Sequence, residues 1–265
     1  MKMPFLTIFT PTYNRAGLLP RLYKSLKSQK SKDFEWIIVD DGSNDGTEEL
    51  VDKWLKEKNK FNIIYKKTKN GGKHRAINLG VKLARGKMFF IVDSDDYLPD
   101  DAVKFIKQNE AALPKGFAGL SGRLIIEPLE GGGSFVGTFR DGVASVDGTT
   151  LERKKNGITG DQAEVFYTEI LREFPFPTFK DERFMEEAVV WNRIARAGFR
   201  IRWFEKPIYV CEYRSDGLSA SARENHKRSP RGYRLYVGEF IKSRAPFKER
   251  AHLALYYLAF RLGLK

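Results

Sequence analysis

Cysteine and long apolar runs are nearly absent from this sequence. Among its 265 residues Cys211 is the single cysteine, so no disulfide can form within the chain, which fits a reducing compartment. No window approaches the roughly 20 apolar residues of a membrane-spanning helix, and the longest apolar run covers only residues 253–260. Residues 1–14 meet proline and polar residues too soon for a signal peptide. We therefore expect a cytoplasmic protein that is soluble, or peripheral at the inner face of the membrane.

Two common nucleotide-binding signatures are also missing. The sequence contains no GxxxxGK[ST] loop, and no GxGxxG follows its first predicted strand. These absences count against a P-loop NTPase and against a nicotinamide-dependent dehydrogenase.

Acidic charge is scarce relative to basic charge, and the formal net charge is +13. Much of this excess lies in residues 223–265, which hold eleven lysines and arginines against three glutamates. A basic segment of this kind points to nucleic acid, anionic lipid or a phosphorylated partner.

The first hundred residues predict an α/β fold. Apolar strands alternate with amphipathic helices and no short hairpin turns lie between them, which predicts βαβ units. We expect a mostly parallel, Rossmann-like central sheet with helices on both faces. The predicted strands cover residues 5–10, 35–40, 61–65 and 87–92, and the helices lie near 18–26, 50–55 and 73–85.

The later part of the chain is less regular. We predict a helix over 161–174 opened by Asp161, a second helix over 184–198 stopped by Gly198, and two short strands at 200–204 and 207–213. From about residue 229 the pattern predicts two amphipathic helices. The expected division is a catalytic-type domain over 1–222 and a basic helical extension over 223–265.

The loops after the four predicted strands carry polar, glycine-bearing or charged residues. In open α/β sheets ligands bind beyond the carboxyl ends of the strands, so we expect these loops to form one crevice. The loops are TPTYNR, DDGSNDGT, KKTKNGGKHR and DSDD.

The acidic loop follows the fourth strand. Asp93 and Asp95 hold two carboxylates two residues apart, and Mg²⁺ and Mn²⁺ prefer oxygen ligands. A solvated turn is an equally good interpretation of this loop alone. Asp100 and Asp101 fit the start of the next helix.

Two other loops carry weaker signals. Asp40 or Asp41 could accept a hydrogen bond from a nucleobase, although the same loop also fits a plain connection whose polar residues cap the next helix. Lys73 and Arg75 follow two glycines at a helix start, an arrangement that suits phosphate. His74 between them is expected at the surface rather than on a metal.

A pair of glutamates opens the helix predicted over 184–198. Glu186 and Glu187 precede an apolar run, and glutamates in a first turn stabilise a helix through its dipole. A carboxylate beside apolar walls at the edge of a cleft can alternatively act as a general base.

Taken together, these motifs resemble the family 2 glycosyltransferases, inverting enzymes of the GT-A fold that include bacterial polysaccharide enzymes. The resemblance covers Met3 to about Gly198 in the expected order. It implies a nucleotide-sugar donor, with UDP as the nucleotide, a divalent metal (Mn²⁺ or Mg²⁺), and a glycan or lipid-linked acceptor. The residues it assigns to the donor are Pro11, Tyr13, Asp41, Lys73, Arg75, Asp93 and Ser94.

The same resemblance assigns Asp95 to the metal and Glu187 to the general base. Glu187 stands where most members carry an aspartate, so the carboxylate is longer by one methylene. The implied reaction is a single displacement in which the base removes a proton from an acceptor hydroxyl.

Two other classes of protein fit part of the pattern. A sugar nucleotidyltransferase would use a similar diphosphate site but should carry a glycine-rich, arginine-bearing first loop, which TPTYNR is not. A non-catalytic nucleic-acid-binding protein would explain the charge but not the acidic loops, so we expect no nucleic-acid partner. For residues 223–265, contact with an anionic membrane and simple packing on the first domain fit equally well.

Overall fold

A computed structural model describes residues 3–126, 134–212, 221–243 and 245–262. One sheet runs through the molecule in the strand order β3-β2-β1-β4-β8-β5-β9-β7, with β6 paired to β5. The strands are β1 Leu6–Thr12, β2 Phe34–Asp40, β3 Asn62–Lys67, β4 Met88–Ile91, β5 Phe117–Ile126, β6 Ser134–Phe135, β7 Ser145–Gly148, β8 Gln162–Tyr167 and β9 Arg200–Cys211.

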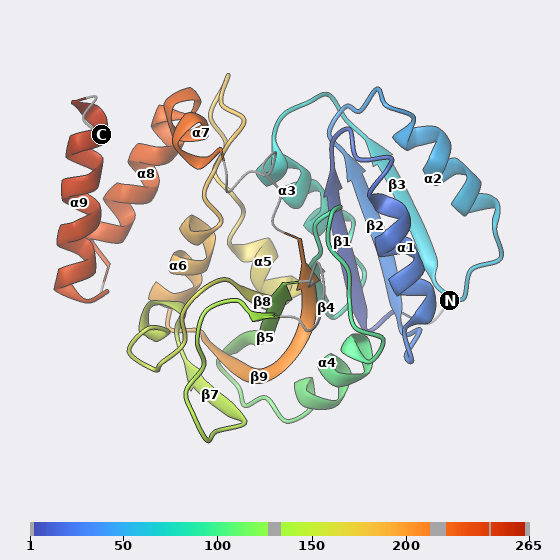
Figure 1. The fold of residues 1–265 in the computed structure, drawn as a ribbon, viewed down its shortest axis with the longest axis horizontal. Helices are drawn as coiled ribbons and strands as arrows, with labels where there is room; N and C mark the ends of the chain where they lie inside the picture. Colours follow the sequence, from blue (N-terminus) through green and yellow to red (C-terminus); the bar gives the residue numbers. More distant parts are fainter. Residues whose placement is uncertain (1–2, 127–133, 213–220, 244, 263–265) are drawn as a thin grey trace.

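Helices lie around this sheet (Figure 1). They are α1 Leu19–Ser28, α2 Thr47–Lys56, α3 Lys73–Leu83, α4 Ala102–Glu110, α5 Thr168–Glu173, α6 Ala188–Arg196, α7 Ala222–Arg228, α8 Pro230–Ile241 and α9 Phe247–Arg261, with a 3₁₀ turn at Thr150–Glu152. The predicted α/β class with helices on both faces is therefore confirmed.

The first four strands are parallel to one another, as the alternating pattern predicts. Beyond β4 the sheet becomes mixed, because β8 runs antiparallel to both β4 and β5. Residues 162–167, which the sequence predicts as helix, thus form a strand, and only α5 is helical in that segment. Four of the six residues of this segment are buried and it pairs with a strand on each side, so strand pairing prevails over its helical pattern.

The strand residues alternate between two cores. Ile8, Trp36 and Phe90 face the cluster that packs against α1, α2 and α4. Their neighbours Phe9, Ile37 and Phe89 face the cluster that packs against α3, α5 and α6. Because β1 to β4 are parallel, the loops that follow them lie at the same edge of the sheet.

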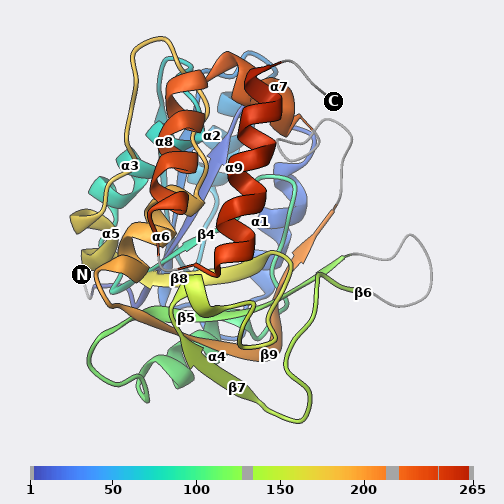
Figure 2. The ribbon, with the colours of Figure 1, turned by 90° about the vertical axis from the view of Figure 1, so that its left-hand side faces the viewer.

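The C-terminal helices pack on α6 and on one another. In both views α8 and α9 form the outermost layer beyond α6 (Figures 1 and 2). Glu239 of α8 accepts hydrogen bonds from Arg193 at 3.0 Å and from Arg196 at 3.0 Å, both on α6. The predicted break between the last two helices is confirmed, since α8 ends at Ile241 and α9 begins at Phe247.

One further detail differs from the sequence interpretation, and another confirms it. Residues 200–204 and 207–213 are predicted as two strands, but residues up to Cys211 form the single strand β9, which continues through Pro207 with shifts in register. Helix α6 ends at Arg196, and Gly198 follows with a φ of +92°, as a C-terminal stop requires.

Helix α3 packs closely on the sheet at Gly80, so a substitution there tests this packing. A side chain at Gly80 would lie 2.2 Å from the ring of Phe9, and that ring is stacked on Phe89 at 5.2 Å. Alanine improves helix propensity by about 1 kcal/mol, but overpacking costs about 1–3 kcal/mol. We expect Gly80→Ala to lower the free energy of unfolding measured in urea.

Gly238 of α8 is the matched control, since a Cβ there meets no atom within 4 Å. We expect Gly238→Ala to raise the free energy of unfolding by about 0.5–1 kcal/mol. Equal effects of the two substitutions would contradict the packing described for α3.

Candidate active site

The loops that follow β1, β2 and β3 are joined by hydrogen bonds at the carboxyl edge of the sheet. The backbone N–H of Asp41 donates to the carbonyl of Thr12 at 2.8 Å, and that of Thr68 donates to the carbonyl of Asp40 at 2.8 Å. Farther along, the N–H of Asn14 donates to Oγ of Ser43 at 2.8 Å. The sheet thus brings together the loops predicted to form one crevice.

Lys73 lies at the centre of this edge. Its Nζ is 2.8 Å from Oδ2 of Asp93, in the loop after β4, and 2.9 Å from Oε1 of Glu187, just before α6. Burial alone lowers the pKa of Lys73, but the two carboxylates outweigh it and hold the pKa well above its ordinary value. The side chain of the lysine is 23% exposed and those of its partners 36% and 35%, so all three can be reached from solvent.

The acidic loop after β4 divides into two kinds of carboxylate. Asp96 is buried, and its oxygens accept hydrogen bonds from the Tyr209 hydroxyl at 2.6 Å and from the Glu212 N–H at 3.1 Å. Burial, and then the charge of Asp93, raise the pKa of Asp96 to about 7. The Tyr209 hydroxyl also accepts the N–H of Asp93 at 3.0 Å, so it holds both ends of the loop.

Asp95 lies between these two acids. Burial and the charge of Asp93 raise the pKa of Asp95 as well. One oxygen of Asp93, Oδ1, is buried without a hydrogen-bond partner among the described residues. The loop thus places crowded, partly buried carboxylates beside a carboxylate oxygen that has no hydrogen-bond partner among the described residues, an arrangement that a cation could complement.

The loop suits a divalent cation whose coordination is completed by a bound ligand. Within the described residues no group of three or more His, Cys, Asp or Glu is arranged to hold a metal by itself. Mg²⁺-type sites, however, commonly use one or two carboxylates together with substrate phosphates. Asp93 and Asp95 supply such carboxylates, and Ser94 between them is buried.

Asp41 is held by the backbone at the start of α3. Its two carboxylate oxygens accept the N–H groups of Gly71 at 2.7 Å and Gly72 at 2.8 Å. Burial raises the pKa of Asp41, although these hydrogen bonds lower it in part. Tyr13 lies 50% exposed at the end of β1, where its ring is open to solvent. Pro11 is a buried residue of β1.

The two residues that follow Lys73 point elsewhere. Arg75 donates to the backbone carbonyl of Gly71 at 3.0 Å and to that of Phe179 at 2.6 Å, so its guanidinium holds the loop that leads to α6. His74 is 3% exposed, so its predicted place at the surface is wrong. It lies on the buried side of α3, and burial lowers its pKa to about 4.

Several residues near the site are not singled out by the sequence. Tyr209 comes from β9, far along the chain, and no local pattern marks it. Glu164 lies on β8, where burial raises its pKa to about 7 and the charge of Glu187 adds to the rise. His226 of α7 contacts Glu186, the neighbour of Glu187, at 2.5 Å. Glu164 lies in the segment that the sequence predicts as helix, so its place in the sheet is not foreseen. The contact between His226 and Glu186 exists only in the tertiary fold.

Comparison with known proteins finds similar glycosyltransferases. Residues 7–122 match the family described as glycosyl transferase family 2. A GalNAc(5)-diNAcBac-PP-undecaprenol beta-1,3-glucosyltransferase from Campylobacter jejuni is 28% identical over 250 residues, which is 89% of this chain and 72% of that protein. Other curated relatives align over shorter stretches, and the chain covers between 10% and 52% of their length.

Solved structures share the fold. Staphylococcus aureus TarS 1–349 in complex with UDP-GlcNAc superposes with a TM-score of 0.65 at 21% identity, covering 97% of this chain and 72% of that one. Mannosyltransferase PcManGT from Pyrobaculum calidifontis, in complex with GDP-Man and Mn²⁺, gives a TM-score of 0.60 at 21% identity, with 97% and 70% covered. These neighbours establish the GT-A fold.

The comparisons do not favour a nucleotidyltransferase or a nucleic-acid-binding protein. The matched family model, the curated relatives and the shared fold agree with one another. The match over residues 7–122 and the similar proteins support a family 2 glycosyltransferase, and hence a transferase.

Proposed function

We propose that this enzyme moves a sugar from a nucleotide-diphosphate donor, a UDP-sugar, to a hydroxyl group of a glycan or lipid-linked acceptor. One observation carries the proposal: Lys73 holds Asp93, in the acidic loop, and Glu187, before α6, within 3 Å of one nitrogen. This puts a carboxylate that can act as base next to the acidic loop, whose carboxylates could bind the donor diphosphate through a divalent cation. UDP-GlcNAc in the TarS complex supports the donor class, and the undecaprenol-linked substrate in the C. jejuni name supports the acceptor class.

The donor is proposed to lie across the strand ends. Tyr13 offers an exposed ring for stacking on the base beside Pro11, and Asp41 supplies carboxylate oxygens for the edge of the nucleobase. Asp93 and Ser94 lie where the ribose and diphosphate would follow. Arg75 is proposed to act indirectly, through the loop that its guanidinium holds.

The reaction is a single displacement that inverts the anomeric carbon. Glu187 takes the proton of the acceptor hydroxyl, the oxygen forms a bond to the anomeric carbon, and the bond from that carbon to the diphosphate oxygen breaks with its electron pair on the diphosphate. Asp95 would hold a divalent cation, which when bound offsets the charge of the departing diphosphate. Lys73 keeps Glu187 turned toward the donor and adds a positive charge there.

The first test concerns the base. We expect Glu187→Gln to lower kcat for sugar transfer by about 10²–10⁴-fold, because the amide cannot take a proton, and to leave donor affinity unchanged by calorimetry. Glu169→Gln, an exposed change on α5, is the control. Full transfer activity in Glu187→Gln would remove Glu187 from the role of base.

The second test concerns the cation. We expect Asp95→Asn to weaken Mn²⁺-dependent UDP binding by about 10²-fold and to abolish transfer, since the site loses several kcal/mol of charge stabilisation. Asp100→Asn serves as the control, because Asp100 is exposed and pairs with Lys30. Unchanged Mn²⁺-dependent binding in Asp95→Asn would refute its assignment.

We propose in addition that the C-terminal helices contact an anionic membrane surface. Four apolar side chains recur at helical spacing along α9 and at the residue that follows it: Phe247, Leu255, Leu258 and Leu262, which are 78%, 68%, 56% and 65% exposed. No helix of the described residues is long and apolar enough to span a membrane. An exposed apolar stripe on a helix within a basic segment suits the bilayer interface instead.

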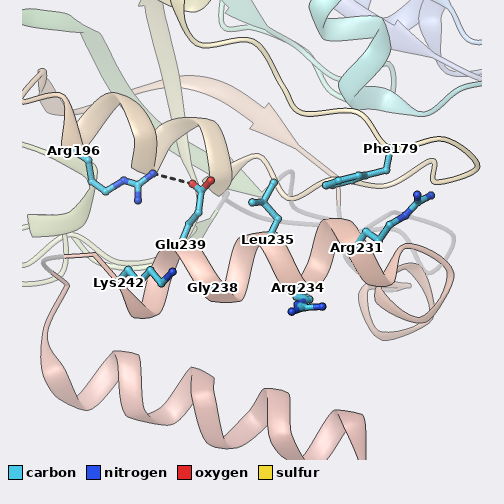
Figure 3. A pocket seen from close by; sticks show the side chains of 8 residues that line it. All are labelled: Phe179, Arg196, Arg231, Arg234, Leu235, Gly238, Glu239 and Lys242. Carbon is cyan, nitrogen blue, oxygen red and sulfur yellow. Dashed lines mark hydrogen bonds and ion pairs between the residues drawn. The ribbon is translucent and has the colours of Figure 1, made fainter.

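A basic groove also lies on the C-terminal helices, beside α8. It has a volume of about 400 Å³ and lies between α8, α6 and the loop at Phe179, where Arg231 points toward the ring (Figure 3). Arg196 pairs with Glu239 in it, whereas Arg234 and Lys242 have no acidic partner among the described residues. Unpaired cations at a groove of this size suit lipid phosphates.

Co-sedimentation with vesicles tests the membrane contact. We expect the protein to sediment with phosphatidylglycerol vesicles and not with phosphatidylcholine vesicles, and the double variant Leu255→Glu with Leu258→Glu to stay in the supernatant. Leu55→Glu, at a leucine 45% exposed on α2, is the matched control. Sedimentation of the double variant at the level of the unmodified protein would rule out α9 as the contact.

A further inference from the structure

The loop over residues 179–187, which carries Glu187 at its end, is fastened on its inner side by the start of α3. Arg75 holds the carbonyl of Phe179 at 2.6 Å. Gly72 approaches the backbone of Arg183 so closely that a side chain at Gly72 would lie 1.9 Å from the Arg183 carbonyl oxygen. The inner side of the loop therefore has a fixed position.

The same loop is fastened on its outer side by the C-terminal helices. Glu182 is buried and accepts hydrogen bonds from the N–H of Arg231 at 2.9 Å and the N–H of Gly232 at 2.8 Å. Oγ of Ser229 accepts the N–H of Phe184 at 3.1 Å. Both contacts come from the first turn of α8 or the residue before it.

The contact nearest to Glu187 is made by His226. Its Nε2 lies 2.5 Å from Oε1 of Glu186, and we assign the tautomer in which Nε2–H donates to the carboxylate. The imidazole ring is stacked on Tyr233 at 3.8 Å with an interplanar angle of 8°, and it meets the edges of Phe184 and Phe260. His226 is 8% exposed, so this ring is fixed by packing from α8 and α9.

Adjacent glutamates would repel one another if both pointed into the site. Here they diverge, because Glu186 is held by His226 and Glu187 by Lys73, on different elements. Glu187 is thus paired with Lys73, while the residue before it is held from the other side by His226.

We propose that His226 and Glu186 are a positioning pair that aims Glu187 at the acceptor hydroxyl, so that α7 and α8 belong to the catalytic unit. The inference rests on the proposed role of Glu187 as base. The sequence predicts a separate basic extension over 223–265. On this proposal the extension contributes to turnover as well as to membrane contact. Neither member of the pair touches the reacting atoms.

Two substitutions of His226 separate positioning from packing. His226→Phe keeps a flat ring on Tyr233 but removes the Nε2–H, whereas His226→Gln keeps an N–H donor and loses the ring. If the pair positions the base, we expect His226→Phe to lower kcat by about 10–100-fold with the donor KM unchanged. We expect His226→Gln to keep most of the kcat of the unmodified protein. His252→Phe, the same change at an exposed histidine of α9, is the control.

The outcomes distinguish this inference from the proposed function. If Glu187→Gln is inactive but His226→Phe turns over at the unmodified rate, the positioning role is wrong and the base remains. If His226→Gln is the damaged variant and His226→Phe is not, the ring serves packing alone. Full activity of Glu187→Gln would instead overturn the base itself.

Amide hydrogen exchange supplies a readout that does not need activity. The N–H groups of Val189 and Val190 donate to the carbonyls of Glu186 and Glu187 at 3.1 and 3.0 Å, in the first turn of α6. We expect these amides to exchange faster in His226→Phe than in His226→Gln. Equal exchange in the two variants would contradict the positioning pair.

Discussion

The arrangement of the site depends on one lysine between two carboxylates. Lys73 begins α3, Asp93 follows β4 and Glu187 precedes α6, and they come from three places that only the folded sheet brings together. A half-buried cation without its partners would be costly, and so would the two acids without the cation. The ion pairs therefore fix the relative positions of the start of α3, the acidic loop and the residues before α6.

Other features of the site follow from this fixed geometry. The start of α3 also donates two backbone N–H groups to Asp41, so the β2 loop takes its place from the same turn. On the opposite side Tyr209 holds the acidic loop through Asp93 and Asp96. The crowded carboxylates of this loop, with Oδ1 of Asp93 unpaired among the described residues, are the feature that a cation and a diphosphate would complement.

The sequence predicts the parallel half of the sheet well because alternation of strand and helix is a local pattern. It also locates the loops at the strand ends, since topology alone places them at one edge. It fails at residues 162–167, where a helical period is overridden by pairing with β4 and β5. It fails as well at His74, because which side of α3 is buried depends on the elements that cover it.

Contacts between distant segments are the part that no local pattern could predict. Glu186 and His226 are forty residues apart in the sequence. Tyr209 is more than a hundred residues from Asp93, whose N–H it accepts. The roles of the donor and metal residues remain predictions that rest on resemblance and on the geometry of the site. The C-terminal helices, which composition describes only as basic and amphipathic, are joined to the loop before α6 by specific hydrogen bonds.

The most direct test is the release of UDP from a panel of UDP-sugars by the protein over residues 1–265, measured with Mn²⁺ and with a chelator. We expect at least one UDP-sugar to yield UDP in the presence of Mn²⁺ and the chelator to abolish the release. Release that is unaffected by the chelator, or no release from any UDP-sugar under either condition, would contradict this expectation.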